Sequence, residues 1–119
     1  MASNPAEISA HTLILHSSSV EGATVVQCRG RLTTETTSIL KAEVKIMMPH
    51  TKRIILDLNE LVRMDSSGLG TLVSLYVSAK SAGCELSLIN MSKPIRDLLG
   101  LSHLLTVFES CGRYGTKVG

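Results

Sequence analysis

Aromatic residues are scarce in this sequence. Its 119 residues include one Phe, two Tyr and no Trp, so a hydrophobic core has to be built from aliphatic side chains and methionine. Proteins that bind single-stranded nucleic acids stack the bases on aromatic rings. The 12 basic residues barely outnumber the 10 acidic ones and form no basic run, so a groove that follows a phosphate backbone is not expected either. We therefore expect no nucleic-acid partner.

Cysteines are also few. Cys28, Cys84 and Cys111 are odd in number, widely spaced and without a C-x-x-C pair, a pattern that predicts neither a disulfide framework nor a zinc site. The four histidines are scattered in the same way, and we assign no metal and no cofactor. Such cysteine usage is typical of a protein in a reducing cytoplasm.

Segments that would direct the chain to a membrane are missing as well. The first residues, MASNPAEIS, lack the basic and apolar blocks of a signal peptide, and no apolar run approaches the roughly 18 residues of a membrane span. With 44% apolar and 18% charged residues, the composition is that of a globular protein. We expect a single cytoplasmic domain over residues 1–119, with its core at about residues 12–109, flexible tails and no direct membrane insertion.

Patterns typical of strands and helices alternate along the chain. Strand-forming residues are concentrated at residues 12–16, 23–29, 53–58, 85–90 and 104–108. Residues 17–22 are predicted to form a hairpin loop between the first two strands, and Gly30 to close the second strand. The run at residues 53–58 is almost continuously apolar, which predicts a strand covered on both faces.

Three helices are predicted from the same patterns. The first begins in residues 33–36, with a hydroxyl cap and an acidic first turn, and is stopped by Pro49. The second follows residues 65–68 and runs to about residue 82. Its inner face is expected to be formed by Leu69, Leu72, Val73 and Tyr76. The third is opened by Pro94 and closed by Gly100.

This alternation of strands and helices predicts an α/β fold. We expect a mixed, mostly parallel sheet of four to five strands, joined by right-handed crossovers, with helices packed on the sheet. The opening hairpin would supply one antiparallel edge strand.

The most informative segment is Met64-Asp65-Ser66-Ser67-Gly68-Leu69-Gly70, which follows Leu56-Asp57-Leu58. It places two hydroxyl groups where the carboxyl end of a strand meets the amino terminus of a helix. Ligand and reaction sites of open α/β sheets lie at such edges, and the free N–H groups and dipole of a helix N-terminus favour anionic groups. A phosphate on a serine would be well tolerated here. From these residues alone, a helix N-cap is the better explanation of Ser66, and Asp65 either orients Ser66 or complements the helix dipole.

The sequence resembles the STAS-domain family, specifically the bacterial anti-sigma factor antagonists, over about residues 12–109. The resemblance rests on the two segments just named, on Ala79-Lys80 before Gly83, and on Ser92-Lys93-Pro94-Ile95 followed by residues 98–101. It implies a STAS-like fold and a regulator that binds a partner protein, not an enzyme.

In this family a serine kinase that is itself the anti-sigma factor phosphorylates the hydroxyl residue after the aspartate, which is Ser66 here. The unphosphorylated domain binds the kinase and frees the sigma factor, phosphorylation ends the binding, and a phosphatase resets the cycle. The resemblance thus implies two partners, a serine-kinase anti-sigma factor and a phosphatase. We expect the loop of the phosphorylation site to be supported by Asp65, Ser67 and Gly68. The candidate partner contacts are Arg31, Thr33 and Leu69.

One position departs from the family's pattern. The family usually has Gly-x-Leu-Asp after the second strand, with the aspartate near the phosphorylated serine, whereas this chain has Gly30-Arg31-Leu32-Thr33. A carboxylate that helps orient the serine or contacts the kinase is therefore missing at Thr33. Arg31 and Arg63 flank the site in sequence, and would pair with a phosphate on Ser66 if both lay near it.

The sequence leaves two alternatives open. A structural STAS subunit of a transporter or signalling assembly would have the same fold and would not need the aspartate. A small serine hydrolase would use Ser66, Asp97 and His103, which follow the serine–acid–histidine order of α/β-hydrolases, although the G-x-S-x-G motif of those enzymes is absent.

Overall fold

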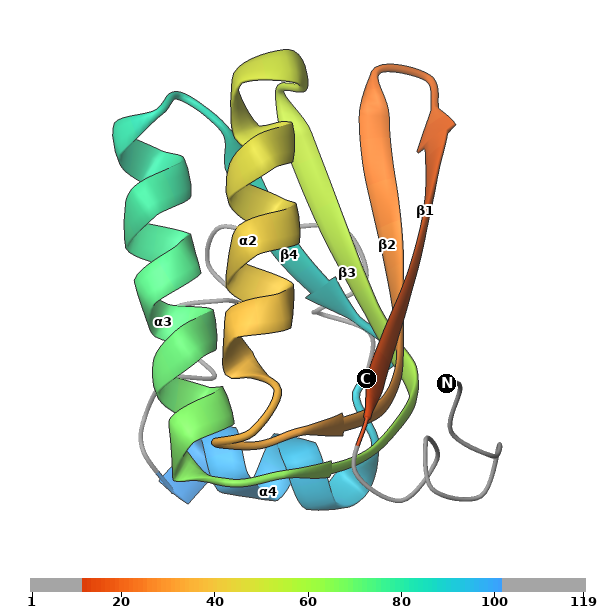
Figure 1. Ribbon diagram of the computed structural model, residues 1–119, viewed down its shortest axis with the longest axis vertical. Coiled ribbons are helices and arrows are strands. Elements are labelled where there is room, and N and C mark those ends of the chain that lie inside the picture. The colour runs from red at the N-terminus through yellow and green to blue at the C-terminus, as the bar shows by residue number, and fades with distance from the viewer. Residues whose placement is uncertain (1–11, 102–119) are drawn as a thin grey trace, which may run out of the picture.

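The structure, a computed structural model, describes residues 12–101, and within them the chain forms a four-stranded sheet. The strands, in their order across the sheet, are β1 (Leu13–Val20), β2 (Ala23–Leu32), β3 (Arg53–Met64) and β4 (Glu85–Ile89). β1 runs antiparallel to β2, whereas β2, β3 and β4 are parallel (Figure 1). The predicted α/β fold with a mostly parallel sheet and one antiparallel edge strand is confirmed. The strand predicted at residues 104–108 lies outside the described residues, as do the tails and Cys111.

The first two strands are longer than predicted and the loop between them is shorter. Only Glu21 and Gly22 form the turn, with φ of 47° and 85°, the positive values that a tight type I′ hairpin turn requires. The prediction of a loop over residues 17–22 was wrong because the exposed serines there pair with β2 as ordinary strand residues. β2 also continues past Gly30 to Leu32.

β3 has twelve residues and is twice as long as its apolar run. Alternate side chains at its start, those of Ile54, Leu56 and Leu58, are completely buried, while the residues between them are only partly buried. The strand was predicted to be covered on both faces; one face is completely covered over residues 53–58, and the other only in part. The second half of β3 continues to pair with β2 although apolar alternation has stopped there, and the ladder contains two register irregularities.

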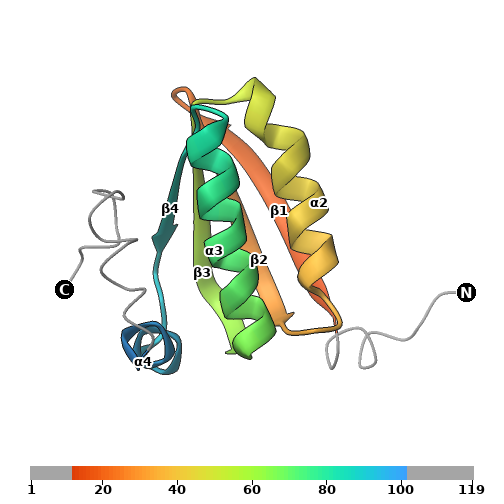
Figure 2. The same ribbon diagram turned by 90° about the vertical axis from the view of Figure 1, so that its left-hand side faces the viewer.

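The helices are α2 (Thr37–Met47), α3 (Ser66–Ser81) and α4 (Lys93–Leu101), with a short 3₁₀ turn, η1 (Met48–His50), after α2. Each parallel strand is added on the same side of the previous one, so right-handed crossovers place both connecting helices on one face of the sheet. α2 and α3 accordingly lie side by side and point the same way (Figures 1 and 2). α4 crosses the end of the domain at which α3 begins (Figure 1).

The start of α2 differs in detail from the prediction. Its N-cap residue, Thr36, makes no side-chain cap, and the first turn contains no acidic residue. The Thr36 hydroxyl instead donates to the carbonyl of Arg31 at 2.8 Å and accepts from the N–H of Thr33 at 3.0 Å. Thr36 is buried, and its side chain holds the preceding loop together instead of capping the helix.

The buried apolar side chains of the helices within residues 12–101 are aliphatic, as expected from the lack of aromatic residues. α3 contributes Leu69, Leu72, Leu75 and Ala79 to the core, whereas Val73 and Tyr76 are only partly buried. Its inner face is therefore turned slightly from the predicted one. α4 contributes Ile95 and Leu99, and it continues through Gly100 rather than ending there. No helix among residues 12–101 is long and apolar enough to cross a membrane.

Gly68 lets the first turn of α3 approach the end of β2. A Cβ atom at this position would collide with the carbonyl oxygen of Leu32, and would also press against the side chains of Leu32 and Met64. The helix start is thus packed directly on strand backbone. Gly70, two residues later in the same helix, is exposed and has open space around its Cα.

We expect Gly68→Ala to lower the free energy of unfolding by about 1–3 kcal/mol, because the backbone of Leu32 cannot yield to the new methyl group. Gly70→Ala is the matched control. It should raise stability by up to about 1 kcal/mol, since alanine is the better helix former and meets nothing. Urea unfolding of both variants measures the difference, and equal stabilities would contradict the close approach.

Candidate functional site

The residues of the serine motif, 64–70, lie at the edge of the sheet where β2 and β3 end. Both connecting helices begin at this same edge, so the loop between β2 and α2 lies beside the first turn of α3 (Figure 1). A backbone hydrogen bond from the N–H of Asp65 to the carbonyl of Leu32, at 3.3 Å, joins the two segments. The structure therefore places the motif at the carboxyl edge of a parallel sheet, as the sequence predicted.

Asp65, not Ser66, caps α3. Its backbone is extended, with φ of −105° and ψ of −173°, and its Oδ1 accepts a hydrogen bond from the N–H of Gly68 at 3.0 Å. The other carboxylate oxygen, Oδ2, accepts from the N–H of Thr34 at 3.2 Å and from the Thr34 hydroxyl at 3.4 Å. One carboxylate thus caps the helix and holds the neighbouring loop.

These hydrogen bonds also set the protonation of Asp65. The N–H of Gly68 is the largest influence that lowers the pKa of the carboxyl group below its ordinary value of 3.8. Desolvation by burial is the next influence and opposes it, while the N–H groups of Thr34 and Ser67 and the Thr34 hydroxyl lower the pKa further. Asp65 is therefore a carboxylate at neutral pH and can only accept hydrogen bonds.

The two serines of the motif have different surroundings. Ser66 is the first residue of α3 and is exposed, and its hydroxyl makes no hydrogen bond to any other residue of the described chain. Ser67 is also exposed, but its Oγ lies 2.8 Å from the Oγ1 of Thr34. Of the two serines, only Ser66 has a hydroxyl without a hydrogen-bond partner among residues 12–101.

Thr34 is the site residue that sequence reasoning missed. The sequence drew attention to Thr33, which stands where the family has an aspartate, yet in the structure Thr33 contributes backbone contacts. Its carbonyl accepts from the N–H groups of Thr36 and Thr37 at 2.9 and 3.0 Å. The threonine-rich stretch predicts a helix start, and no signal in it distinguishes which hydroxyl reaches α3.

The other candidate partner contacts are placed differently. Arg31 and Arg63 are cross-strand neighbours in the β2–β3 ladder, next to the pair formed by Leu32 and Met64. Because successive side chains of a strand point to opposite faces, the arginines point away from the face that Leu32 and Met64 share with the core. The register therefore gives no support to their pairing with a phosphate on Ser66. Leu69 is 8% exposed and packs in the core, so its side chain supports the fold.

The structure shows no triad of Ser66, Asp97 and His103 within the described residues. Asp97 lies on α4, where its carboxylate pairs with Lys93 at 3.1 Å, and His103 lies outside the described residues. Asp57 lies inside β3, where its carboxylate accepts hydrogen bonds from the N–H of Asn59 and the side-chain amide of Asn90, both at 3.0 Å. Among residues 12–101, no three His, Cys, Asp or Glu side chains gather into a metal-binding group.

Replacing Asp65 by asparagine tests the double role of its carboxylate. Asp65→Asn keeps an oxygen for the helix cap but loses acceptors for Thr34, so we expect a loss of up to about 1.5 kcal/mol at pH 7. Because the folded pKa of Asp65 is lowered, its contribution is present above about pH 4 and is lost as the pH falls through the folded pKa. The difference between wild type and variant should therefore shrink in acid.

Urea unfolding at pH 7 and pH 3 measures this difference. The control is Asp97→Asn, which removes an exposed surface ion pair and should change stability by no more than about 0.5 kcal/mol. A difference between wild type and Asp65→Asn that stays the same at both pH values would contradict the assigned role.

Comparison with known proteins shows which proteins this chain is similar to. The chain is 28% identical, over 88 residues, to an anti-sigma F factor antagonist from Paenibacillus polymyxa, which covers 72% of this chain and 75% of the relative. Its structure is similar to that of SpoIIAA of Bacillus in the unphosphorylated form, with a TM-score of 0.66 and 21% identity over 76% of this chain and 82% of that one. A sulfate transporter family protein from Wolinella succinogenes has the same fold, with a TM-score of 0.68 and 18% identity over 77% and 76% of the two chains.

A family model decides the classification. The model described as "Mlab, STAS domain" matches residues 15–109, which is most of the chain. The resemblance found in the sequence, the sheet topology and this match agree: the chain belongs to the STAS-domain family.

Proposed function

We propose that this protein is an anti-sigma factor antagonist whose binding to a serine-kinase anti-sigma factor is switched off by phosphorylation of Ser66 and restored by a phosphatase. The observation that carries the proposal is the exposed Ser66, whose hydroxyl has no hydrogen-bond partner within residues 12–101, directly after the capping Asp65. It occurs in a STAS domain that is similar to an anti-sigma F factor antagonist. Sigma factors work in the cytoplasm, so the proposal places this protein there.

The chain would supply an acceptor and a docking surface, and no catalysis. The kinase brings ATP and the base that removes the serine proton, and Ser66 needs only to be reachable. The N–H groups of the first turn of α3 and the positive end of its dipole would stabilise the phosphate once formed. All of this is compatible with a domain that does not change shape.

The fold of a relative supports the same conclusion. SpoIIAA has been solved unphosphorylated and phosphorylated, and this chain matches the two forms with TM-scores of 0.66 and 0.63. Both forms therefore keep the fold seen here. We infer that a phosphate on Ser66 would act on the surface that meets the partner.

That surface combines the phosphorylation site with exposed apolar side chains. At the same end of the domain, Val62 is 72% exposed on β3 and Ile39 is 42% exposed in the first turn of α2. Apolar side chains beside a polar centre are what a protein interface buries. A phosphate in the middle of such an interface would be unpaired and costly to desolvate.

The acceptor is predicted to be Ser66 and not Ser67. Incubation with the partner kinase and ATP should label the wild type and Ser67→Ala and leave Ser66→Ala unlabelled, because only Ser66 has a free hydroxyl next to the aspartate. Phosphopeptide mapping by mass spectrometry identifies the modified residue. Labelling of Ser66→Ala at the wild-type rate would refute the assignment.

A negative charge at Ser66 is predicted to weaken binding without unfolding the domain. Phosphoserine adds about −1.5 to −2 charges at neutral pH, and at a helix N-terminus that charge does not destabilise the fold. Ser66→Asp should melt near the wild-type temperature and bind the kinase at least about tenfold more weakly, which corresponds to about 1.4 kcal/mol.

Calorimetric titration together with thermal melting measures both quantities. Ser18→Asp, which adds the same charge at an exposed position of β1, is the control and should bind like the wild type. Normal binding by Ser66→Asp would contradict the switch, and loss of its folded structure would mean that the charge acts through stability.

A second candidate function is that of a structural subunit in a transporter assembly. The similarity to the sulfate transporter family protein from Wolinella succinogenes favours it, since a STAS fold there belongs to a different kind of protein. In that role the domain would bind its partner permanently and carry no phosphate on Ser66. Mass spectrometry of the protein from its native cells separates the two roles.

A further inference from the structure

We propose that Thr34 determines which of the two adjacent serines is modified, by holding the hydroxyl of Ser67 in a hydrogen bond and leaving that of Ser66 free. The proposal rests on the proposed function, because it concerns the choice of acceptor by the same kinase. Thr34 acts here as a positioning residue in the loop between β2 and α2.

Three contacts connect Thr34 to the start of α3. Its N–H lies 3.2 Å and its hydroxyl 3.4 Å from Oδ2 of Asp65, and the same hydroxyl lies 2.8 Å from Oγ of Ser67. The carboxylate can only accept, and the threonine hydroxyl has one proton. When that proton points to Asp65, the proton of Ser67 must be the one shared with Thr34.

This arrangement opposes phosphorylation of Ser67. In the transfer, the serine oxygen bonds to the γ-phosphorus of ATP, the bond from that phosphorus to ADP breaks, and the serine proton passes to a base of the kinase. Ser67 would have to give up its hydrogen bond to Thr34 before its oxygen and proton became available. Ser66 meets no such requirement, because its hydroxyl has no hydrogen bond within the described residues.

The negative charge of Asp65 also opposes phosphorylation of Ser67. A phosphate on Ser67 would take the place of the hydroxyl next to Thr34, whose other partner is the ionised carboxylate. Two anions would then compete for one hydroxyl donor and one N–H group. The Thr34 contacts therefore disfavour both the reaction at Ser67 and its product.

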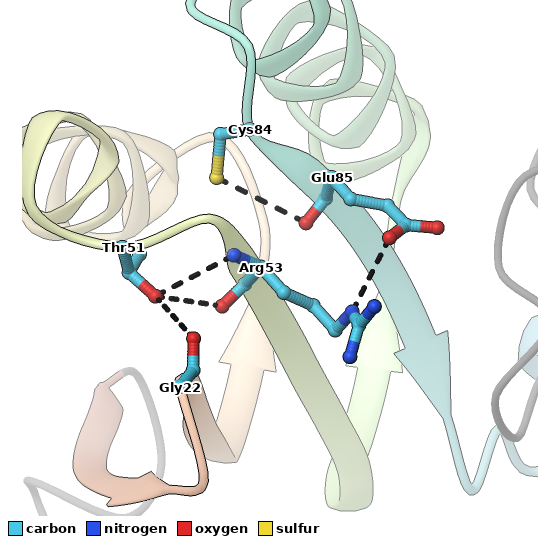
Figure 3. Close-up of polar contacts among 5 residues, drawn as sticks. All are labelled: Gly22, Thr51, Arg53, Cys84 and Glu85. Atoms are coloured by element: carbon cyan, nitrogen blue, oxygen red, sulfur yellow. Dashed lines mark hydrogen bonds and ion pairs between the residues drawn. The ribbon is translucent and has the colours of Figure 1, made fainter.

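The test uses a protein in which Ser66 cannot react. In the Ser66→Ala background, Thr34→Val removes the hydroxyl and keeps the side chain's shape, and Thr34→Ser keeps the hydroxyl. Thr51→Val is the matched control. The Thr51 hydroxyl also makes several hydrogen bonds, to the carbonyls of Gly22 and Arg53 at 3.4 and 3.0 Å and from the N–H of Arg53 at 3.5 Å, at the opposite end of β3 (Figure 3).

The proteins are incubated with Mg²⁺-ATP and lysate of the source cells, and the phosphate is located by mass spectrometry. Labelling of Ser67 should rise about fivefold or more in Ser66→Ala/Thr34→Val, the factor expected from one lost hydrogen bond. Ser66→Ala combined with Thr34→Ser or with Thr51→Val should stay at the level of Ser66→Ala alone. An equal rise with Thr51→Val would overturn the proposal, because general loosening of the fold would then be the cause.

A kinase-free measurement tests the contact itself. Thr34→Val and Ser67→Ala each remove one partner of the same hydrogen bond, so the double variant should lose less in melting temperature than the sum of the two single losses. Additive losses would overturn the proposal.

The two proposals fail in different ways. If the wild type takes up no phosphate on Ser66, the proposed function is wrong, and the proposal that Thr34 determines the acceptor is wrong as well. If the wild type is phosphorylated on Ser66 but Ser66→Ala/Thr34→Val shows no rise at Ser67, the role of Thr34 alone is wrong.

Discussion

This end of the domain depends on the hydrogen bonds that the carboxylate of Asp65 accepts. One oxygen satisfies the N–H of Gly68 in the first turn of α3, and the other holds the loop before α2 through Thr34. The N–H of Asp65 itself bonds to the last residue of β2. A single residue therefore joins a helix start, a loop and a strand end. The missing side chain of Gly68 lets these three backbone segments lie against one another.

The contacts of Asp65 explain how the exposed Ser66 is held in a defined position. Ser66 lies directly between the capping aspartate and a first turn that is packed on the sheet, so its backbone is held although its side chain is exposed. The neighbouring Ser67 is tied to the loop by Thr34. Two chemically identical residues thus acquire different properties from their contacts.

The sheet order places these groups together. Because β2, β3 and β4 are parallel and in sequence order, the helices that follow β2 and β3 begin at one edge of the sheet and on one face. The same edge carries the exposed Val62 and Ile39. A phosphate on Ser66 would lie at a helix N-terminus that stabilises it, at the same end of the domain as these two exposed apolar side chains, which a docked partner would bury. This combination suits a switch that changes binding while the fold stays the same.

The sequence by itself determined the order of the elements, the mostly parallel sheet and the position of the serine motif between β3 and α3, because these follow from apolar periodicity and turn residues within short segments. Strand lengths could not be read in this way. β1 and the second half of β3 carry exposed polar residues that become strand only by pairing with β2. Only the tertiary structure decided that Asp65 is the cap and that Thr34 rather than Thr33 reaches the site. The contacts of Thr34 with Asp65 and Ser67 join residues about thirty positions apart, so the packing of two backbone segments determines them. The cap from Asp65 to Gly68 is local, but Asp65 and Ser66 are equally good N-cap residues by residue type, so the pattern does not choose between them.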